Sequence, residues 1–218
     1  MCHESCIDFG KANLKEEDVR DKSVIEVGSL NVNGSLRSII EAFMPSSYIG
    51  VDLVGGAGVD QICKIENLIN KFGRNRFDLV ICTEVLEHVR NWEKAIHNLK
   101  QINKPNGVIL ITTRSRGKAY HGYPYDFWRY EIYDMKLIFS DFSIKILEED
   151  PQSPGVFFLG RKPKDFIENN AEIKLYSILL NTRTSIAIAS IYEFLRIRRI
   201  KYYFKHPLEI MGMFRRKK

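Results

Sequence analysis

The sequence predicts an α/β fold, namely a doubly wound, mostly parallel seven-stranded sheet with a terminal antiparallel strand pair and a helical C-terminal extension. Short, almost uninterrupted apolar runs alternate with helix-like stretches along the 218 residues, a pattern typical of parallel strands covered on both faces. The length suits one large core, and 44% hydrophobic with 28% charged residues excludes a disordered or fibrous chain.

Five apolar runs define the predicted parallel strands. The run Phe77–Thr83 has the clearest pattern, and Gly58–Cys63 has the weakest. The predicted strands cover residues 23–28, 47–52, 58–63, 77–83 and 108–113.

Helices are expected between these strands, and an antiparallel pair after them. Asn91 can cap a helix from Trp92 to about Ile102, which Pro105-Asn-Gly107 should end. Further helices are predicted at about 35–43 and 131–139, and the turn-rich stretch 150–155 should join antiparallel strands at 142–147 and 156–160.

Charge divides the chain into two predicted parts. The first is an N-terminal domain at 1–162, which begins with a short helical lead-in, and the second is a basic extension at 163–218. From Arg161 to the end there are 14 Lys/Arg against 5 Asp/Glu, whereas the first 160 residues hold 19 against 22. Helices are expected at Phe166–Leu180 and Ser185–Tyr203. These basic helices could lie on an anionic membrane, or could pack as a lid or dimer element with their charges merely solvated. Nucleic acid ranks third, since no RNA- or DNA-binding motif is found.

Cysteine usage and the chain start favour a reducing, cytoplasmic location, and the basic extension could add peripheral contact at the inner membrane face. No apolar run of about 18 residues is present, and no secretory signal precedes the body. The four cysteines are too few and too irregular for a disulfide framework. Cys2, His3 and Cys6 would supply only three ligands at atypical spacing, so we predict no metal site.

The first two strands end in groups suited to a nucleoside. Gly28 and Gly34 permit a tight turn and a close backbone approach to a ligand. Asp52, at the end of the second strand, could accept hydrogen bonds from two ribose hydroxyls. The glycine spacing does not match a dinucleotide motif, and a plain turn with a surface aspartate is the alternative interpretation.

Read together, four segments resemble the successive motifs of class I S-adenosylmethionine-dependent methyltransferases. The segments are Val24–Gly28, Tyr48–Asp52, Phe77–Val89 and Asn103–Thr112, and the resemblance runs from about residue 23 to 162. Its Glu84-Val-Leu-Glu-His88 stretch is closest to the group that acts on small molecules, and the segment at 121–126 is of a kind associated with glycan synthesis.

The resemblance implies S-adenosylmethionine as cofactor and a set of residues that bind it. Glu26 would lie near its methionine part, Asp52 would hold its ribose, and Thr83 with Glu84 would face its sulfonium. The full set is Glu26, Gly28, Asn33, Gly34, Asp52, Ile65, Glu66, Asn67, Thr83 and Glu84. The chain departs from the family in the long spacing from Gly28 to Gly34 and in Lys64, where an acid is common.

An aromatic segment after the fifth strand is the candidate acceptor site. His121 is the candidate general base, because an imidazole with an unperturbed pKa of about 6.5 accepts protons near neutral pH. Asp126 would assist it, and the predicted substrate-binding residues are Tyr123, Tyr125, Trp128 and Arg129. In the alternative interpretation, Trp128 packs under the sheet edge and Asp126–Arg129 is a structural ion pair.

His88 is the rival catalytic histidine, and a hydrogen-bonded histidine that holds its loop is an equal alternative. The sequence therefore predicts O-methylation of a small-molecule or saccharide acceptor, which could be lipid-linked. Two alternatives are a cofactor-binding scaffold without turnover and an RNA methyltransferase that uses the basic extension.

Overall fold

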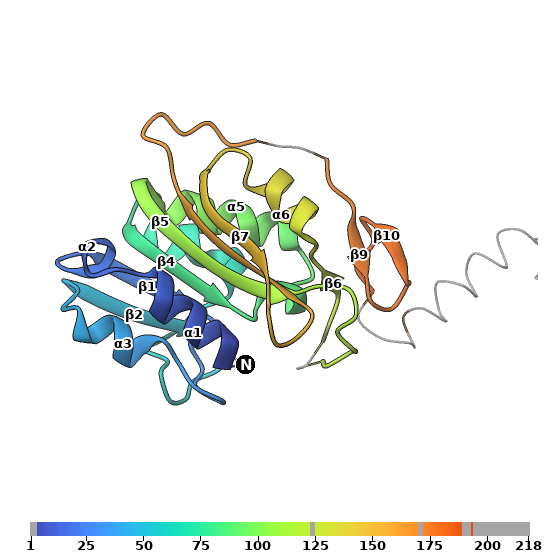
Figure 1. Cartoon of the computed structure of the whole chain (residues 1–218), viewed down its shortest axis with the longest axis horizontal. Helices are drawn as coiled ribbons and strands as arrows, with labels where there is room; N and C mark the ends of the chain where they lie inside the picture. The colour runs from blue at the N-terminus through green and yellow to red at the C-terminus, as the bar shows by residue number, and fades with distance from the viewer. Residues whose placement is uncertain (1–3, 123–124, 170–171, 189–192, 194–218) are drawn as a thin grey trace, which may run out of the picture.

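The computed structural model contains the predicted seven-stranded sheet with helices on both faces (Figure 1). It describes residues 4–122, 125–169, 172–188 and 193. The strand order is β3-β2-β1-β4-β5-β8-β7, in which β8 runs antiparallel to both β5 and β7. The remaining neighbours are parallel, so the predicted fold class is confirmed. The strands are β1 Ser23–Val27, β2 Ser47–Asp52, β3 Gln61–Ile62, β4 Phe77–Thr83, β5 Asn103–Arg114, β7 Ser143–Glu149 and β8 Gly155–Arg161.

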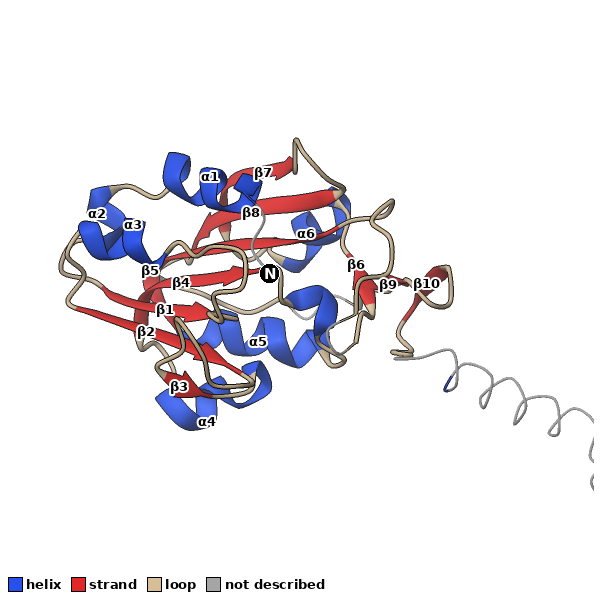
Figure 2. Ribbon diagram, turned by 90° about the horizontal axis from the view of Figure 1, so that it is seen from below, coloured by secondary structure: helices blue, strands red, loops and turns tan. Residues whose placement is uncertain are grey.

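Helices cover the sheet on two sides, each with its own apolar core (Figure 2). Successive strand residues point to opposite faces, so Val24 faces one core and Ile25 the other. One face carries α1 Glu4–Asn13, α2 Glu16–Val19 and α3 Arg37–Ala42. The other carries α4 Leu68–Phe72, α5 Trp92–Ile102 and α6 Ile132–Ile138, and two 3₁₀ turns, η1 Ile65–Asn67 and η2 Leu86–His88, follow β3 and β4.

Several boundaries follow directly from local chemistry. The helix α5 begins and ends where predicted, and the Asn91 side chain accepts a hydrogen bond from the Lys94 amide at 3.1 Å. The strand β3 is shorter than predicted, because the Asp60 carboxylate accepts the Gly50 amide that a longer strand ladder would use. In contrast, β5 is longer than predicted and starts at Asn103.

The predicted helix at Phe166–Leu180 is wrong. The described part of this segment is extended and then forms β9 Leu175–Ser177, which pairs with β10 Thr182–Thr184 and with β6 Trp128–Arg129. Ile173, Leu175 and Ser177 are buried alternately with exposed or half-buried neighbours, which is the period of a strand. The partner strand β6 lies far away in the sequence, so local helix-forming residues misled the prediction.

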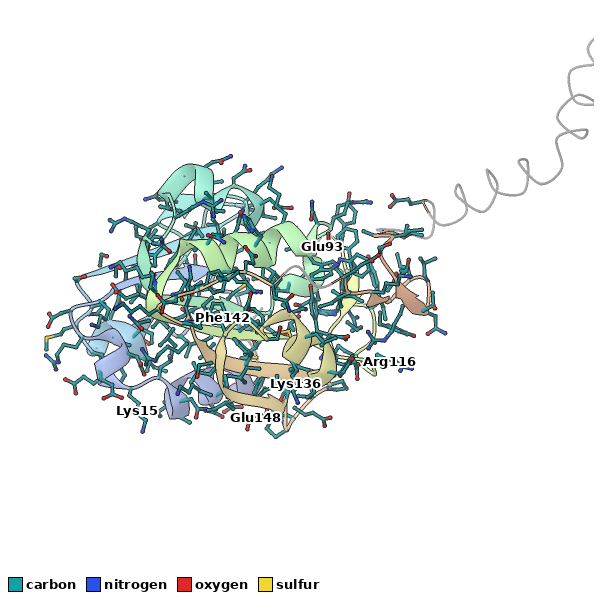
Figure 3. The ribbon with its side chains drawn as sticks, turned by 90° about the horizontal axis from the view of Figure 1, so that it is seen from above. Lys15, Glu93, Arg116, Lys136, Phe142 and Glu148 are labelled. Atoms are coloured by element: carbon teal, nitrogen blue, oxygen red, sulfur yellow. The ribbon has the colours of Figure 1, made fainter. Side chains whose placement is uncertain are left out.

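This segment covers the face of the sheet that carries α5 and α6. Phe142, which is labelled in Figure 3, packs edge-on against Phe166, with ring centroids 5.5 Å apart. Glu168 accepts a hydrogen bond from Gln101 and lies 2.8 Å from His97 Nδ1. Phe166 and Glu168 thus hold the segment after β8 against α5 and the turn before β7.

The second predicted helix, Ser185–Tyr203, falls almost entirely outside the described residues, as does the basic end of the chain. The described helices include none with the length and apolarity needed to cross a membrane.

Candidate active site

The carboxyl ends of β1, β2 and β4 meet at one edge of the sheet, where ligands of doubly wound folds bind. The Gly28 and Ser29 amides both donate to the Val51 carbonyl, at 2.8 and 3.1 Å. Gly28 has φ 83°, and a Cβ at this position would lie 2.1 Å from Val85 Cγ2. Only glycine therefore allows the turns after β1 and β4 to approach this closely.

Asp52 joins the loop after β1 to the end of β2. Its Oδ2 accepts the Leu30 amide at 3.2 Å, and its Oδ1 accepts the Leu53 amide at 2.6 Å. No ion pair to this half-buried carboxylate exists within the described part of the chain. Leu53, Val54 and Val32 are each about half exposed beside it. A carboxylate without an ion-pair partner in the described residues, near exposed apolar side chains, fits a nucleoside, whose ribose needs an acceptor and whose base needs apolar cover.

The remaining predicted cofactor residues of this edge lie in two turns. Gly34 donates its amide to the Asn31 side chain in the loop after β1, which also contains Asn33. In η1 the Ile65 side chain is buried in the core, whereas Glu66 is half-buried and Asn67 is exposed. The turn is tied to the site because the Cys63 amide donates to the Asp52 carbonyl.

Glu26 is buried in β1 and is held by neighbouring hydroxyls. Tyr48 donates to its carboxylate at 2.5 Å and Ser35 at 3.3 Å. Burial raises the pKa of Glu26 to about 7, although both hydrogen bonds oppose this shift.

Thr83 and Glu84 close β4 with both side chains buried. Glu84 has φ 57° and accepts hydrogen bonds from Thr112 Oγ1, at 3.1 Å, and from Arg114 Nε. Arg114 also donates to Asp150 at 2.9 Å. The Glu84 carboxylate is thus held by an internal guanidinium.

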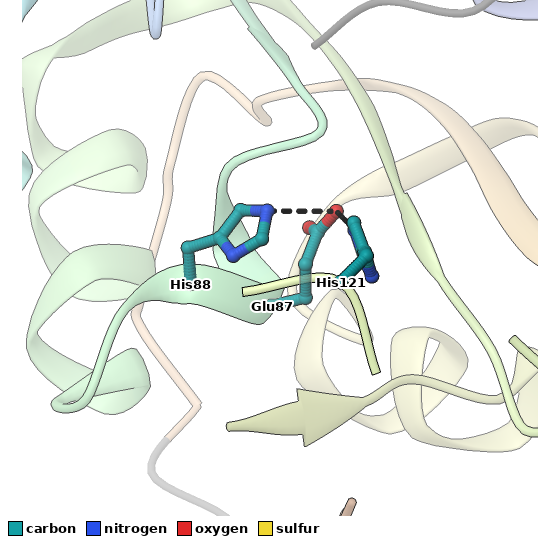
Figure 4. Close-up of side chains that lie close together, drawn as sticks. All are labelled: Glu87, His88 and His121. Carbon is teal, nitrogen blue, oxygen red and sulfur yellow. Dashed lines mark ion pairs between the residues drawn. The ribbon is translucent and has the colours of Figure 1, made fainter. Parts of the chain in front are cut away.

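Shortly after Glu84 in the chain, Glu87 and His88 approach His121, and these three side chains form what we call the Glu87 cluster (Figure 4). Glu87 Oε1 lies 3.8 Å from the Nε2 atom of each histidine. The two imidazole rings meet edge to face with centroids 5.0 Å apart. The Glu87 side chain is completely buried, whereas those of His88 and His121 are 18% and 27% exposed. The cluster therefore opens to solvent on the histidine side only.

The charges in this region are strongly coupled. Burial would raise the pKa of Glu87, but the nearby His121 imidazole and the charge of His88 lower it to about 2. The pKa of His121 is raised to about 9, first by its contact with Asp126 and then by Glu87. The expectation of a neutral imidazole with an ordinary pKa therefore does not describe His121, which is protonated at neutral pH in this arrangement.

The aromatic segment divides into exposed and buried halves. Tyr120 and Tyr125 are 47% and 48% exposed, whereas every residue from Asp126 to Tyr130 is buried. Tyr123 lies outside the described residues.

The interpretation of Trp128 and Arg129 as acceptor-binding groups does not fit their burial, and the packing alternative does. Arg129 donates to both carboxylate oxygens of Asp126, at 2.6 and 2.7 Å, and neither side chain is exposed. Trp128 donates its indole N–H to the Val89 carbonyl at 3.1 Å. Asp126 also contacts His121 Nδ1 at 3.1 Å, so its position suits orienting that histidine.

Comparisons with known proteins agree with this geometry. A family model described as a methyltransferase domain matches residues 3–147, which is more than half of the chain. The chain belongs to the methyltransferase domain family. Methyltransferases of this class I fold use S-adenosylmethionine as methyl donor, which confirms the predicted family and cofactor.

Solved structures show the same fold at low sequence identity. Burkholderia thailandensis 1,6-didemethyltoxoflavin-N1-methyltransferase, with bound S-adenosylhomocysteine, superposes with a TM-score of 0.57 at 15% identity, covering 73% of this chain and 79% of that one. A Listeria monocytogenes structure described as a putative S-adenosylmethionine-dependent methyltransferase superposes with a TM-score of 0.55 at 12% identity. The match covers 72% of this chain and 96% of that one.

Curated relatives match over short stretches. The ubiquinone biosynthesis O-methyltransferase of Rickettsia canadensis is 44% identical over 55 residues, or 25% of this chain and 23% of the relative. The enzyme of the same name from Rickettsia prowazekii is 52% identical over 42 residues, which is 19% of this chain and 17% of the relative. The methyltransferase thus aligns with less than a quarter of the length of these relatives.

Sequence analysis missed Glu87 as a site residue, although it lies between the chosen Glu84 and His88. An acidic residue beside a histidine just after a buried strand was the available signal. Its importance depends on His121, which only the fold brings within reach.

Proposed function

We propose that this methyltransferase transfers the methyl group of S-adenosylmethionine to a hydroxyl oxygen of a small-molecule or saccharide acceptor. The observation that carries the proposal is the position of the Glu87 cluster. Its three acceptor atoms lie at the carboxyl edge of the sheet that also carries Asp52, one turn after β4. A hydroxyl acceptor must lose its proton, and the Glu87 carboxylate or the His88 imidazole would receive it, because His121 already carries a proton at neutral pH.

On the cofactor side, the proposed binding groups are those predicted from the sequence. Asp52 would hold the ribose, while the Gly28–Gly34 loop and η1 would line the nucleoside. When bound, S-adenosylmethionine supplies an electrophilic methyl group on a positively charged sulfur. Gly28 and its neighbour Val85 would bring the turn after β4 against the reacting end, so that the acceptor is positioned close to the methyl group.

On the acceptor side, we assign binding to Tyr120 and Tyr125 and proton transfer to the Glu87 cluster. Tyr120 precedes His121 in the chain and the Tyr125 carbonyl contacts His88, and both exposed rings can stack on a flat ring or a sugar face. The acceptor oxygen forms its bond to the methyl carbon as the carbon–sulfur bond breaks, and the hydroxyl proton passes to the cluster. Asp126 would keep His121 in place during this step. The O-methyltransferase names of the partial relatives support oxygen as the acceptor atom.

The test is product analysis with methyl-labelled S-adenosylmethionine and a panel of phenols, saccharides and RNA. We expect label in a hydroxyl-bearing small molecule, with the methyl group located on oxygen by mass spectrometry. Glu87→Gln should lose most of this activity, whereas Glu93→Gln, an exposed change on α5, should keep it. Label on nitrogen, on carbon or in RNA would contradict the proposal. S-adenosylmethionine binding without any product across the panel would favour the scaffold alternative instead.

A further inference from the structure

We propose that the Glu87 cluster is a binding site for one divalent transition-metal ion, such as Zn²⁺, Co²⁺ or Mn²⁺. The ligands are Glu87 Oε1, His88 Nε2 and His121 Nε2, which come from η2 and from the loop after β5. The role of the ion in methyl transfer rests on the function proposed above, but its binding does not.

The distances suit shared coordination and are too long for direct hydrogen bonds. Each histidine Nε2 lies 3.8 Å from Glu87 Oε1, and one ligand atom from each residue lies within 4.8 Å of the others. Ligands at about 2.0–2.2 Å from a tetrahedral ion are separated by roughly 3.4 Å. Ring rotations that shorten the longest separation from at most 4.8 Å to roughly 3.4 Å, about 0.7 Å at each imidazole tip, would close the cluster around an ion.

The outer contacts of both histidines present Nε2 to the centre of the cluster. His88 Nδ1 lies 2.6 Å from the Tyr125 carbonyl, which can only accept a hydrogen bond. His121 Nδ1 lies 3.1 Å from the Asp126 carboxylate. Metal-binding histidines typically donate their other ring N–H to a carbonyl or carboxylate in this way, which fixes the ring and directs Nε2 at the metal. The ion would displace the proton that His121 carries without it.

Glu87 provides the independent observation that a ligand is needed here. Its Oε1 is buried and has no hydrogen-bond partner in the described part of the chain, and it points at the two histidines (Figure 4). The neighbouring buried carboxylates Glu84 and Asp126 each pair with a guanidinium, from Arg114 and Arg129. Glu87 has only the Thr113 hydroxyl on its other oxygen. The two imidazoles are the nearest groups that offset its charge, but both Nε2 atoms lie beyond hydrogen-bond distance of Oε1. A cation between the three ligand atoms would satisfy this buried oxygen directly.

The donor set selects the class of ion. Two imidazoles and one carboxylate suit Zn²⁺, Co²⁺ and similar ions, whereas Mg²⁺ and Ca²⁺ prefer oxygen ligands alone. Three protein ligands leave a coordination position open, as in catalytic sites, and the exposed sides of His88 and His121 place it toward solvent. A hydroxyl acceptor at that position would lose its proton more readily, because a bound cation lowers the pKa of its oxygen ligand.

The experiment is a metal titration of the untagged, full-length protein after removal of metal with a chelator. Co²⁺ binding is followed by its visible d–d absorption and Zn²⁺ binding by calorimetry. We expect one ion per chain, and at least about 100-fold weaker binding in Glu87→Gln and in His121→Ala, since loss of outer contacts alone costs 10–100-fold. His97→Ala removes a half-exposed histidine elsewhere and should bind like wild type. A Cys2→Ser/His3→Ala variant should do the same and excludes binding by the N-terminal segment.

Circular dichroism shows whether each variant is folded, and the partly exposed His121 offers a second test if Glu87→Gln does not fold. The proposal is wrong if folded wild-type protein binds neither ion, or if Glu87→Gln and His121→Ala bind as tightly as wild type. Calorimetry with S-adenosylhomocysteine, run in parallel without metal, separates the two proposals. Cofactor binding without metal binding would reject the metal site alone, and metal binding without cofactor binding would reject the proposed function alone.

Discussion

At the scale of single residues, Glu26 carries a carboxyl group that is almost completely buried. Its pKa of about 7 lies above the ordinary value of 4.5, because burial outweighs the hydrogen bonds from Tyr48 and Ser35. Between these two pH values the folded protein keeps a proton that the unfolded chain has lost. The free energy of unfolding therefore falls as the pH rises from 4.5 through 7.

Glu26→Gln should remove this dependence. The neutral amide can still accept the Tyr48 hydrogen bond, so the variant should match wild type near pH 4.5 and exceed its stability at pH 8 by at most about 3 kcal/mol. Urea unfolding at both pH values measures the difference. Identical pH profiles for the two proteins would show that Glu26 titrates normally.

Gly28 is the second residue on which the site depends, because its positive φ and its contact with Val85 act together. Gly28→Ala should destabilise the protein by about 3 kcal/mol, through backbone strain and through overpacking. Gly73 is the matched control, since it has φ 80° but nothing within 4 Å of an added Cβ. Gly73→Ala should therefore cost only the strain, about 1 kcal/mol.

Chemical denaturation of Gly28→Ala, Gly73→Ala and Gly28→Ala/Val85→Ala separates the two effects. The double variant should recover part of the loss, because the smaller side chain removes the clash. Equal costs for the two glycines would contradict a close contact between the turns after β1 and β4.

At the scale of elements, strands that are buried on both faces were predicted well and the C-terminal segment was not. The bounds of β2, β4 and α5 agree with the sequence, because continuous apolar runs and the Asn91 cap are local signals. The strand β9 exists because β6 offers an edge, and that edge is defined by residues nearly fifty positions earlier. Local patterns cannot contain this information.

The same distinction applies to the candidate site. Asp52 and the glycine loop could be proposed from strand ends alone, whereas the Glu87 cluster joins residues from two loops. The aromatic run after β5 drew attention to Trp128 and Arg129, yet the fold buries both and leaves Tyr125 exposed. An aromatic-rich sequence gives no sign of which rings face solvent.

The packing of β9 gives a prediction of its own. Leu175 is fully buried in the core on the α5–α6 face, whereas Ile167 is 86% exposed. Leu175→Ala should lower the free energy of unfolding by about 2–5 kcal/mol, and Ile167→Ala should leave it nearly unchanged. Denaturation measurements that gave both variants the same small effect would show that the segment after β8 is not part of the core.

At the scale of the whole molecule, the proposed cofactor site and the Glu87 cluster lie at the same edge of the sheet. Parallel strands place their carboxyl ends together, so Asp52 after β2 and Glu87 after β4 share this edge although 35 positions separate them. The described part of the extension after β8 packs against α5 and β6. The proposed function therefore depends first on the claim that the cofactor binds at this edge.

Calorimetric titration of the full-length protein with S-adenosylhomocysteine tests that claim most directly. We predict saturable binding to wild type and to Glu93→Gln, and about 10–100-fold weaker binding to Asp52→Ala, since hydrogen bonds to a charged group contribute about 1.5–3 kcal/mol. Folded wild-type protein that binds no S-adenosylhomocysteine, or an Asp52→Ala variant that binds it as tightly as wild type, would contradict the account.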